Sequence, residues 1–282
     1  MSLELVKELR TKTGAGMLDC QNALKESGGN MEQAIDFLRK KGLAAAAKKA
    51  SRSAKEGMLG FYSDSKGNEQ ALVEVNCETD FVVKTEDFQN FVKKLTNQIV
   101  AQKPNDLNAA FEIKMDGRSV RDTLTDLVGK IGENIQFRRF VNWKTNGSAE
   151  KITSYLHAGN KIGVLVRFEN ATALKVESGR DVAMHIAAMS PQFVSKDQVG
   201  SDIIEKEKEI YRAQMKDEKK PAAIMEKILE GKIRKHLADV CLEDQNFVKD
   251  PEGKKSVKEW LTAQAPGAKI KEFVRLEVGE GN

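Results

Sequence analysis

Side chains that commonly perform chemistry are few in this sequence and lie far apart. The sequence holds three histidines and three cysteines, at His157, His185, His236, Cys20, Cys77 and Cys241. No two of them stand at the spacing of a zinc site, and an odd number of cysteines fits no disulfide framework. Neither a glycine-rich phosphate-binding motif nor a GxSxG nucleophile motif occurs. We therefore expect no bond-making active site, no cofactor and no bound metal.

The individual histidines and cysteines favour structural roles. His185 lies in the apolar segment VAMHIAAM, which favours a core histidine over a metal ligand. Cys20 falls on the apolar face of an expected helix, and Cys77 has no basic neighbour that would lower the pKa of its thiol. His157 stands at the end of an expected strand beside a glycine turn, where partner recognition and turn stabilisation both remain open.

One stretch, NCETDFVVKTEDF (76–88), places an acid beside a large aromatic residue just after the apolar run ALVEV. Two interpretations of it stay open. In the first, Phe81 packs beneath the preceding strands and Asp80 caps a turn, because phenylalanine is usually buried. In the second, the end of the strand holds Phe81 rigidly so that it enters a pocket of a partner protein, with Asp80 at the rim.

Composition and charge exclude several classes of protein. Forty per cent apolar and 31% charged residues are ordinary for a globular protein. No apolar run approaches the roughly 20 residues of a membrane-spanning helix, and the N-terminus resembles neither a signal peptide nor a transit peptide. With so few cysteines, the sequence predicts a reduced, cytoplasmic protein without a membrane partner.

The net charge of +4 is concentrated near the N-terminus. The segment RKKGLAAAAKKASRSAK (39–55) carries seven positive charges and no acid, as a nucleic-acid-binding patch would. No aromatic residue is interleaved for base stacking, and alanine-rich helices bearing lysines are commonly solvated connectors. Nucleic acid is therefore the less favoured partner.

The pattern of apolar residues predicts an α+β fold with a small helical module in front. Three short helices are expected within residues 1–41, followed by a linker up to Gly57. A hairpin, a helix capped by Thr85, a helix at VRDTLTDLVGKIG and a less regular strand at ENIQFRRFVNW come next. A second hairpin (152–170) and a second helix (179–191) repeat this order, which indicates an internal duplication with helices on antiparallel sheets.

A helical hairpin is expected at about 201–237, inserted before a last strand at 269–281. Its apolar stripes are Ile203, Ile210, Ile224 and Ile228. Lys219-Lys220-Pro221 fits the turn, with the proline at the first helical position of the second arm. The expected domains are residues 1–54, the bundle with its linker; 55–144, the first core subdomain; and 145–282, the second, which contains the hairpin.

Several separated motifs, in order and spacing, resemble the bacterial translation elongation factor Ts family. They are LVKELRTKTGAGMLDCQNAL (5–24), EVNCETDFVVKTEDF (74–88), KIGENIQFRR (130–139), LHAGNKIGVLV (156–166), DQNFVKDP (244–251) and FVRLEVGEG (273–281). The resemblance implies a guanine-nucleotide exchange factor for the GTPase elongation factor Tu in its GDP form. It also implies a ubiquitin-associated-like (UBA-like) three-helix bundle, a duplicated α+β core and a coiled-coil hairpin through which a homodimer could form.

The resemblance also implies which residues touch the GTPase. The family motif that disturbs the magnesium site of the GTPase falls on Thr79, Asp80, Phe81 and Val82. Further contact positions fall on Ile131, Gly132, Glu133, His157, Met17 and Leu18. Some members continue with another helix that docks on the GTPase, whereas this sequence ends at Asn282, which puts that contact in doubt. Two other functions stay open: an RNA- or ribosome-binding protein that uses residues 39–55, and a generic adaptor whose bundle binds other proteins.

Overall fold

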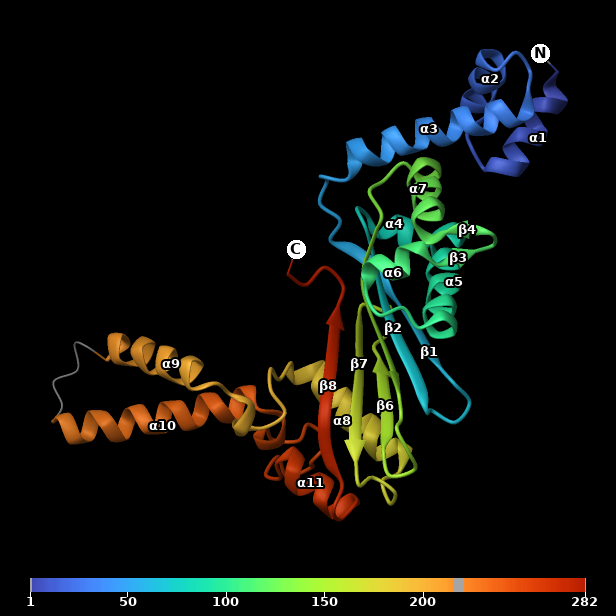
Figure 1. The fold of residues 1–282 in the computed structure, drawn as a ribbon. Coiled ribbons are helices and arrows are strands. Elements are labelled where there is room, and N and C mark those ends of the chain that lie inside the picture. Colours follow the sequence, from blue (N-terminus) through green and yellow to red (C-terminus); the bar gives the residue numbers. More distant parts are fainter. Residues whose placement is uncertain (1, 216–220, 282) are drawn as a thin grey trace.

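The computed structural model describes residues 2–215 and 221–281, and it begins with three helices (Figure 1). They are α1 (Leu3–Thr13), α2 (Met17–Glu26) and α3 (Met31–Lys49). The side chains of Ser2 and Asn30 accept hydrogen bonds from the first turns of α1 and α3. Val6, Leu9 and Leu24 are among the buried residues of a small separate core. The three helices are confirmed, whereas a UBA-like identity of the bundle stays a prediction.

The third helix is longer than the sequence predicts. It continues through the alanine run to Lys49, where a linker is expected. Alanine has the highest helix propensity, and the single Gly42 costs only about 1 kcal/mol in a helix interior. Gly42 also lies against Gly129 of a later helix: a Cβ atom placed on Gly129 would be 3.5 Å from the Gly42 Cα. The N-terminal module therefore packs on the core instead of hanging from a flexible linker.

The first sheet is antiparallel and has the strand order β1-β2-β5. Its strands are β1 (Glu56–Ser63), β2 (Glu69–Cys77) and β5 (Gln136–Lys144). Between β2 and β5 come α4 (Asp80–Val83), α5 (Glu86–Gln102), α6 (Leu107–Glu112), β3 (Lys114–Met115), β4 (Arg118–Ser119) and α7 (Val120–Ile131). Thr85 caps α5 by accepting a hydrogen bond from the Phe88 N–H, which confirms the expected helix start. Helices α5 and α7 pack on one face of this sheet.

The second sheet is also antiparallel, with the order β6-β7-β8. Its strands are β6 (Lys151–Leu156), β7 (Ile162–Glu169) and β8 (Lys269–Glu277). The segment between β7 and β8 contains α8 (Val176–Met189), the 3-10 turns η1 (Lys196–Gln198) and η2 (Leu242–Asp244), and α11 (Val257–Gln264). The second hairpin is confirmed, and α8 begins three residues earlier than expected. An internal duplication and the domain boundaries stay predictions.

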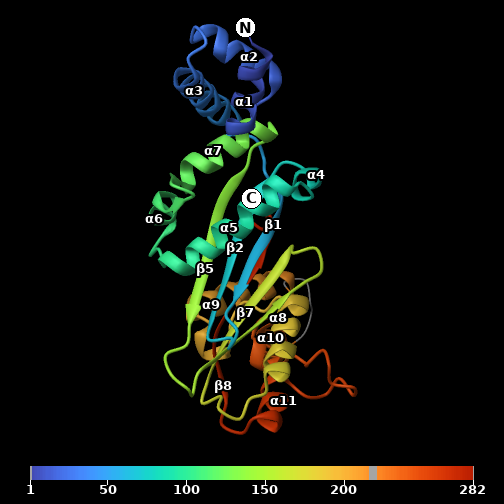
Figure 2. The same cartoon turned by 90° about the vertical axis from the view of Figure 1, so that its right-hand side faces the viewer.

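The two sheets pack against each other, with helices on their outer faces (Figure 2). Leu59 and Leu72 from the first sheet meet Leu165 and Leu276 from the second in a buried layer. Gly163 is required at this contact, because a Cβ atom there would lie 2.9 Å from side-chain carbons of both Leu59 and Leu72. The two halves of the core are thus joined by apolar packing.

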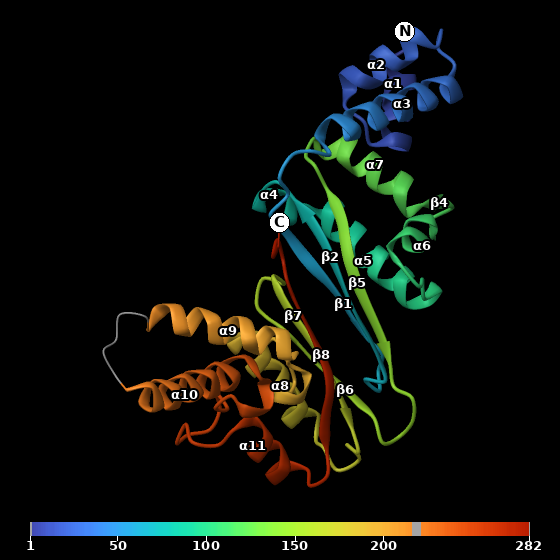
Figure 3. The ribbon, with the colours of Figure 1, turned by 60° about the vertical axis from the view of Figure 1, so that its left-hand side comes forward.

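The expected helical hairpin is present as α9 (Ser201–Gln214) and α10 (Ala222–Val240), which project from the second sheet (Figure 3). Ile228 lies in the seam between the helices, whereas Ile203, Ile210 and Ile224 are exposed and do not contribute to it. The inward face is set instead by side chains such as those of Ile204 and Tyr211.

The turn of the hairpin differs from the prediction at Pro221. Pro221 precedes α10 instead of beginning it, and Lys219 and Lys220 lie outside the described residues. Self-association through the hairpin stays a prediction. None of the helices in the described ranges is long and apolar enough to cross a membrane.

Candidate functional site

The TDFV segment forms a one-turn helix at the end of a central strand. Strand β2 ends at Cys77, Thr79 keeps an extended backbone, and α4 begins at Asp80. The Thr85 hydroxyl donates to the Val82 carbonyl oxygen at 2.7 Å, so the cap of α5 also closes α4. The segment is therefore held between a buried strand and a long helix, and it is a helical turn where the sequence suggested a simple turn.

Two neighbouring side chains in α4 point in opposite directions. Phe81 is 75% exposed, whereas Val82 is 5% exposed and belongs to the first core. The interpretation in which Phe81 packs beneath the hairpin is thus wrong, because Val82 fills that place. Full burial of a phenylalanine side chain stabilises a fold by about 1.5–3 kcal/mol. Because Phe81 is mostly exposed, it contributes little of this stabilisation. An exposed aromatic on a fixed backbone is suited to a partner's pocket.

Asp80 is engaged with a lysine on the next turn. The Lys84 ammonium donates to its carboxylate at 2.8 Å and lies 5.4 Å from the centre of the Phe81 ring. The hydrogen bond from Lys84 lowers the pKa of Asp80 below its ordinary value, so this exposed carboxylate is ionised at neutral pH. The tip of α4 therefore presents an aromatic ring flanked by one negative and one positive charge.

Glu133 fixes the turn that carries Phe81. Its carboxylate accepts hydrogen bonds from the backbone N–H groups of Glu78 (3.1 Å) and Thr79 (3.0 Å) and from the Thr79 hydroxyl (2.7 Å). Gly132 ends α7 in the left-handed conformation, at φ +87°, which glycine adopts at little cost. Ile131 is partly buried against the first core. Glu133 therefore holds the turn, while Gly132 and Ile131 belong to the end of α7. That these three residues contact a partner stays a prediction.

Glu78 and Asn134, which sequence reasoning missed, complete this attachment. The Glu78 carboxylate accepts a hydrogen bond from the Asn134 backbone N–H at 2.6 Å, and the Arg52 guanidinium lies 3.5 Å from the same oxygen. The loop after β2 and the loop after α7 are thus joined in both directions. Glu133 accepts from the backbone of the first loop, and Glu78 accepts from the backbone of the second. The only signal for them in the sequence was their position, since each is a polar residue directly next to a family motif (79–82 and 131–133).

His157 lies in a turn that is attached to the first sheet. Its backbone N–H donates to the Ile162 carbonyl oxygen at 2.9 Å, and its Nδ1 is 3.0 Å from the Tyr155 hydroxyl oxygen. The Leu59 N–H of β1 donates to the Asn160 carbonyl oxygen at 2.8 Å. The exposed imidazole thus stands on a structured turn, so both of its expected roles remain open.

Lys161 connects the same turn to the end of β2. It forms an ion pair with Glu56 at 2.6 Å, and Glu56 pairs with Cys77 in the sheet. The hydrogen bond to Glu56 raises the pKa of Lys161, and the negative charge of Asp80 contributes further. The second hairpin's turn and α4 are consequently within electrostatic range of each other.

Met17 and Leu18 lie elsewhere on the molecule. They begin α2 and are 45% and 69% exposed. Figure 1 places α2 at the end of the N-terminal module that is far from α4. Leu18 and Phe81 are therefore exposed apolar side chains at two separate places on the molecule, called here the two exposed apolar points.

The basic segment 39–55 is less available for nucleic acid than its sequence indicates. Arg39 pairs with Asp122 at 2.7 Å, Lys41 with Asp19 at 2.7 Å, and Arg52 lies 3.5 Å from Glu78. Three of its seven positive charges are thus adjacent to carboxylates. Their attraction for phosphate is reduced accordingly.

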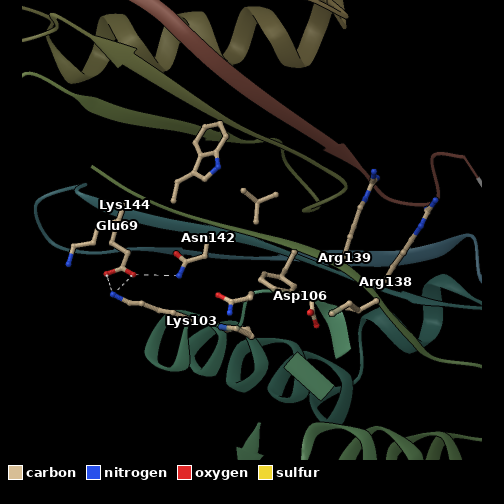
Figure 4. Close-up of a pocket in the computed structure, with 13 residues that line it drawn as sticks. Glu69, Lys103, Asp106, Arg138, Arg139, Asn142 and Lys144 are labelled. Carbon is tan, nitrogen blue, oxygen red and sulfur yellow. Dashed lines mark hydrogen bonds and ion pairs between the residues drawn. The ribbon is translucent and has the colours of Figure 1, made fainter. Parts of the chain in front are cut away.

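A groove of about 620 Å³ runs beside β5 (Figure 4), and most of its charged side chains have partners. Lys103 pairs with Glu69 at 3.1 Å, and the Asp106 carboxylate caps α6. Arg138 and Arg139 both pair with the carboxylate of Glu74, which is completely buried. These groups stabilise the sheet and its connections, so the groove has no evident catalytic arrangement in the described part of the chain.

Cys77 and His185, two further candidates for chemistry, are buried. Burial raises the pKa of the Cys77 thiol to about 12, and the nearby Glu133 carboxylate adds to this shift. His185 is fully buried, where its Nε2 is 2.9 Å from Gln245 Oε1 and its Nδ1 accepts a hydrogen bond from the Val248 N–H. Its expected role as a core histidine is confirmed.

A comparison with known protein families gives a match over most of the chain. The model of the family described as Elongation factor TS matches residues 78–280. The chain belongs to this family. Elongation factor Ts proteins are nucleotide exchange factors for elongation factor Tu and perform no bond-making chemistry of their own. The match begins at Glu78, so it includes α4 and Glu133 and leaves Met17 and Leu18 outside.

Proposed function

We propose that this chain releases GDP from elongation factor Tu by inserting Phe81 between structural elements of the GTPase beside its magnesium ion. The observation that carries the proposal is the exposure of Phe81, 75%, on a helical turn whose preceding backbone is fixed by Glu133. A rigid anchor loses little conformational entropy on binding, so more of its contact energy is available to distort the partner.

The magnesium ion explains why a small displacement would be sufficient. A GTPase holds its nucleotide through phosphate-loop amides and a magnesium ion that bridges phosphate oxygens. The ion is the largest local charge, so movement of its ligands weakens phosphate binding strongly. Linkage is reciprocal: GDP weakens binding of the factor as much as the factor weakens binding of GDP. An incoming nucleotide then displaces the factor, which makes the cycle catalytic.

The other predicted residues would contribute in different ways. Asp80 supplies charge beside the inserted ring, and Thr79 and Glu133 direct the ring. Val82 packs beneath it as part of the core. His157 contacts the GTPase from the neighbouring turn, while Met17 and Leu18 bind a second region of its nucleotide-binding domain.

A fluorescent-GDP release assay with elongation factor Tu tests the proposal. The wild-type protein should accelerate release, and Phe81→Ala should reduce the acceleration by about 30- to 1,000-fold, as expected for a loss of about 2–4 kcal/mol. Phe61→Ala is the matched control, since Phe61 is an exposed aromatic on β1. Unchanged release with a folded Phe81→Ala protein would refute the insertion.

The GDP release assay, together with an RNA-binding measurement on the same purified protein, distinguishes the proposed function from the two alternatives. An RNA- or ribosome-binding protein would bind RNA with a steep dependence on salt and leave GDP release unaffected. A generic adaptor would bind partners without accelerating release. Accelerated release by the wild-type protein contradicts both.

A further inference from the structure

We infer that Asn134 is a positioning residue that couples the N-terminal module to the turn carrying Phe81. In this arrangement the two exposed apolar points, around Leu18 and at Phe81, engage one GTPase molecule together. The inference rests on the proposed function and adds a residue to which no contact role has been assigned.

The first observation is that the side chain of Asn134 binds the segment that follows α3. Its Nδ2 donates to the Arg52 carbonyl oxygen at 2.7 Å and lies 3.5 Å from that of Ala50. Both neighbours are carbonyl oxygens, which fixes the amide orientation with its nitrogen toward them. Asn134 is only 4% exposed, so these hydrogen bonds are sheltered from water. They fasten the segment that joins the N-terminal module to β1.

The second observation is the backbone of the same residue, which holds the Phe81 turn. The Asn134 N–H donates to the Glu78 carboxylate at 2.6 Å, and the preceding residue, Glu133, accepts from the Thr79 hydroxyl. Asn134 is thus hydrogen-bonded both to the segment that follows the module and to the turn that precedes α4.

The third observation is that α7, which ends just before Asn134, lies directly against the module (Figures 2 and 3). Gly129 lies against Gly42 of α3, and Arg39 of α3 pairs with Asp122 of α7 at 2.7 Å. A Cβ atom on Gly14, in the loop that leads into α2, would be 3.3 Å from side-chain carbons of Lys130. The position of the module is therefore set by the same helix whose end sets the position of Phe81.

A rigid connection would raise affinity without adding a contact. Once one of two linked sites is bound, the second binds at an effective concentration that depends on the stiffness and length of the connection. The contacts between α3 and α7 keep the module near its place, and the Asn134 hydrogen bonds restrict its remaining movement. Without these bonds the segment at residues 50–52 loosens, and a smaller share of the module's orientations reaches the partner. The half-saturating concentration should rise while the step at the magnesium site is unaffected.

Asn134→Ala tests this directly in the full-length protein. We expect the KM for elongation factor Tu with bound GDP to rise by about tenfold, with kcat for GDP release unchanged. Asn142→Ala is the matched control, because Asn142 lies on β5 and its side chain is directed to Glu69. A Gly-Gly insertion between Ser51 and Arg52 should reproduce the rise if Asn134→Ala fails to fold. A fall in kcat at unchanged KM would overturn the inference.

A double-mutant cycle identifies the module as the origin of the effect. Leu18→Ala should raise KM in the wild-type background and have little effect in the Asn134→Ala background, since an uncoupled module contributes little affinity. Equal costs in both backgrounds would contradict the coupling. If Leu18→Ala and Phe81→Ala slow release but Asn134→Ala does not alter KM, the proposed function survives and only the coupling is wrong.

A measurement without the GTPase gives an independent answer. Spin labels at Gln33→Cys and Glu86→Cys would report the distance between the module and α5, because both positions are exposed whereas the three native cysteines are fully buried. The distance distribution should be narrow in the otherwise native chain and broader with Asn134→Ala. An unchanged distribution would exclude the coupling regardless of the exchange results.

Discussion

The hydroxyl of Thr79 donates a 2.7 Å hydrogen bond to the carboxylate of Glu133, which is 54 positions later in the chain. The same carboxylate accepts two backbone N–H groups, so the direction of Phe81 depends on a residue from a different element. The exposed ring is thus supported by a charged acceptor that is itself fixed at the end of α7.

Thr79→Val should slow stimulated GDP release by about tenfold while leaving the fold intact. The substitution keeps the shape of the side chain and removes one hydrogen bond to a charged group, worth about 1.5 kcal/mol. Glu133→Gln should cost more, because all three donors lose a charged acceptor. The effects should not add in the double variant, since both changes disrupt one interaction. Strictly additive effects on the release rate would show that the two residues act independently.

Phe81→Ser and Val82→Ala should have different effects on the stability of the fold. Phe81→Ser should leave the melting temperature unchanged, because the ring makes little contact within the chain. Val82→Ala should reduce the free energy of unfolding by about 2 kcal/mol through loss of core packing. Thermal unfolding monitored by circular dichroism gives both values. A strong destabilisation by Phe81→Ser would mean that the ring packs in solution.

The Asp80–Lys84 pair separates two roles of Asp80. Asp80→Asn and Lys84→Ala each break the pair and should leave the melting temperature unchanged, since exposed pairs one helical turn apart contribute little. If Asp80 acts on the GTPase directly, only Asp80→Asn slows GDP release. Equal slowing by both variants would instead assign the pair a role in holding the tip of α4.

The lowered pKa of the Asp80 carboxylate predicts how GDP release depends on pH. The pKa of Asp80 is lowered by Lys84, so its folded-state stabilisation is present above the ordinary pKa and is lost only as pH falls through the lowered value. The deficit of Asp80→Asn in GDP release should therefore be the same at about pH 8 and about pH 5.5. A deficit that disappears at the lower pH would show that Asp80 is protonated there.

His185 should make the second half of the core sensitive to acid. Burial lowers its pKa below the ordinary value of 6.5, so the unfolded chain binds a proton that the folded chain excludes. Stability then rises with pH through this range, and it falls as pH drops below about 6.5, by at most about 1.4 kcal/mol per pH unit. Denaturant unfolding at several pH values would measure the slope. His185→Gln should reduce the slope.

Features that depend on short-range patterns were predictable from the sequence. The two hairpins follow from apolar runs on either side of glycine turns, and the start of α5 follows from Thr85 and the apolar residues after it. The end of α3 was predicted too early for a local reason as well. A run of alanines with lysines occurs both in linkers and in helices, so composition alone does not distinguish them. The packing of α3 against Gly129 could not be inferred without the tertiary structure.

The supports of the candidate site were not predictable in the same way. Phe81 and Val82 are both apolar neighbours, and only the folded chain shows that Val82 is buried and Phe81 is not. Glu133 matched a family motif, yet its hydrogen bonds to the Thr79 turn depend on how α7 ends. Glu74 offered a signal that was overlooked, since an acid within the apolar strand ALVEV requires buried partners.

Glu74 also has a consequence for the order in which the protein completes its fold. Its buried carboxylate receives Arg138 and Arg139 from β5 and then the N–H of Gly279, 205 positions after Glu74 itself. Contacts between residues so distant in sequence form late, because a long loop must close first. During synthesis on the ribosome, the strands of the first sheet are therefore made early, but Glu74 receives this last hydrogen-bond donor only after β8 and the Gly279 that follows it have been translated.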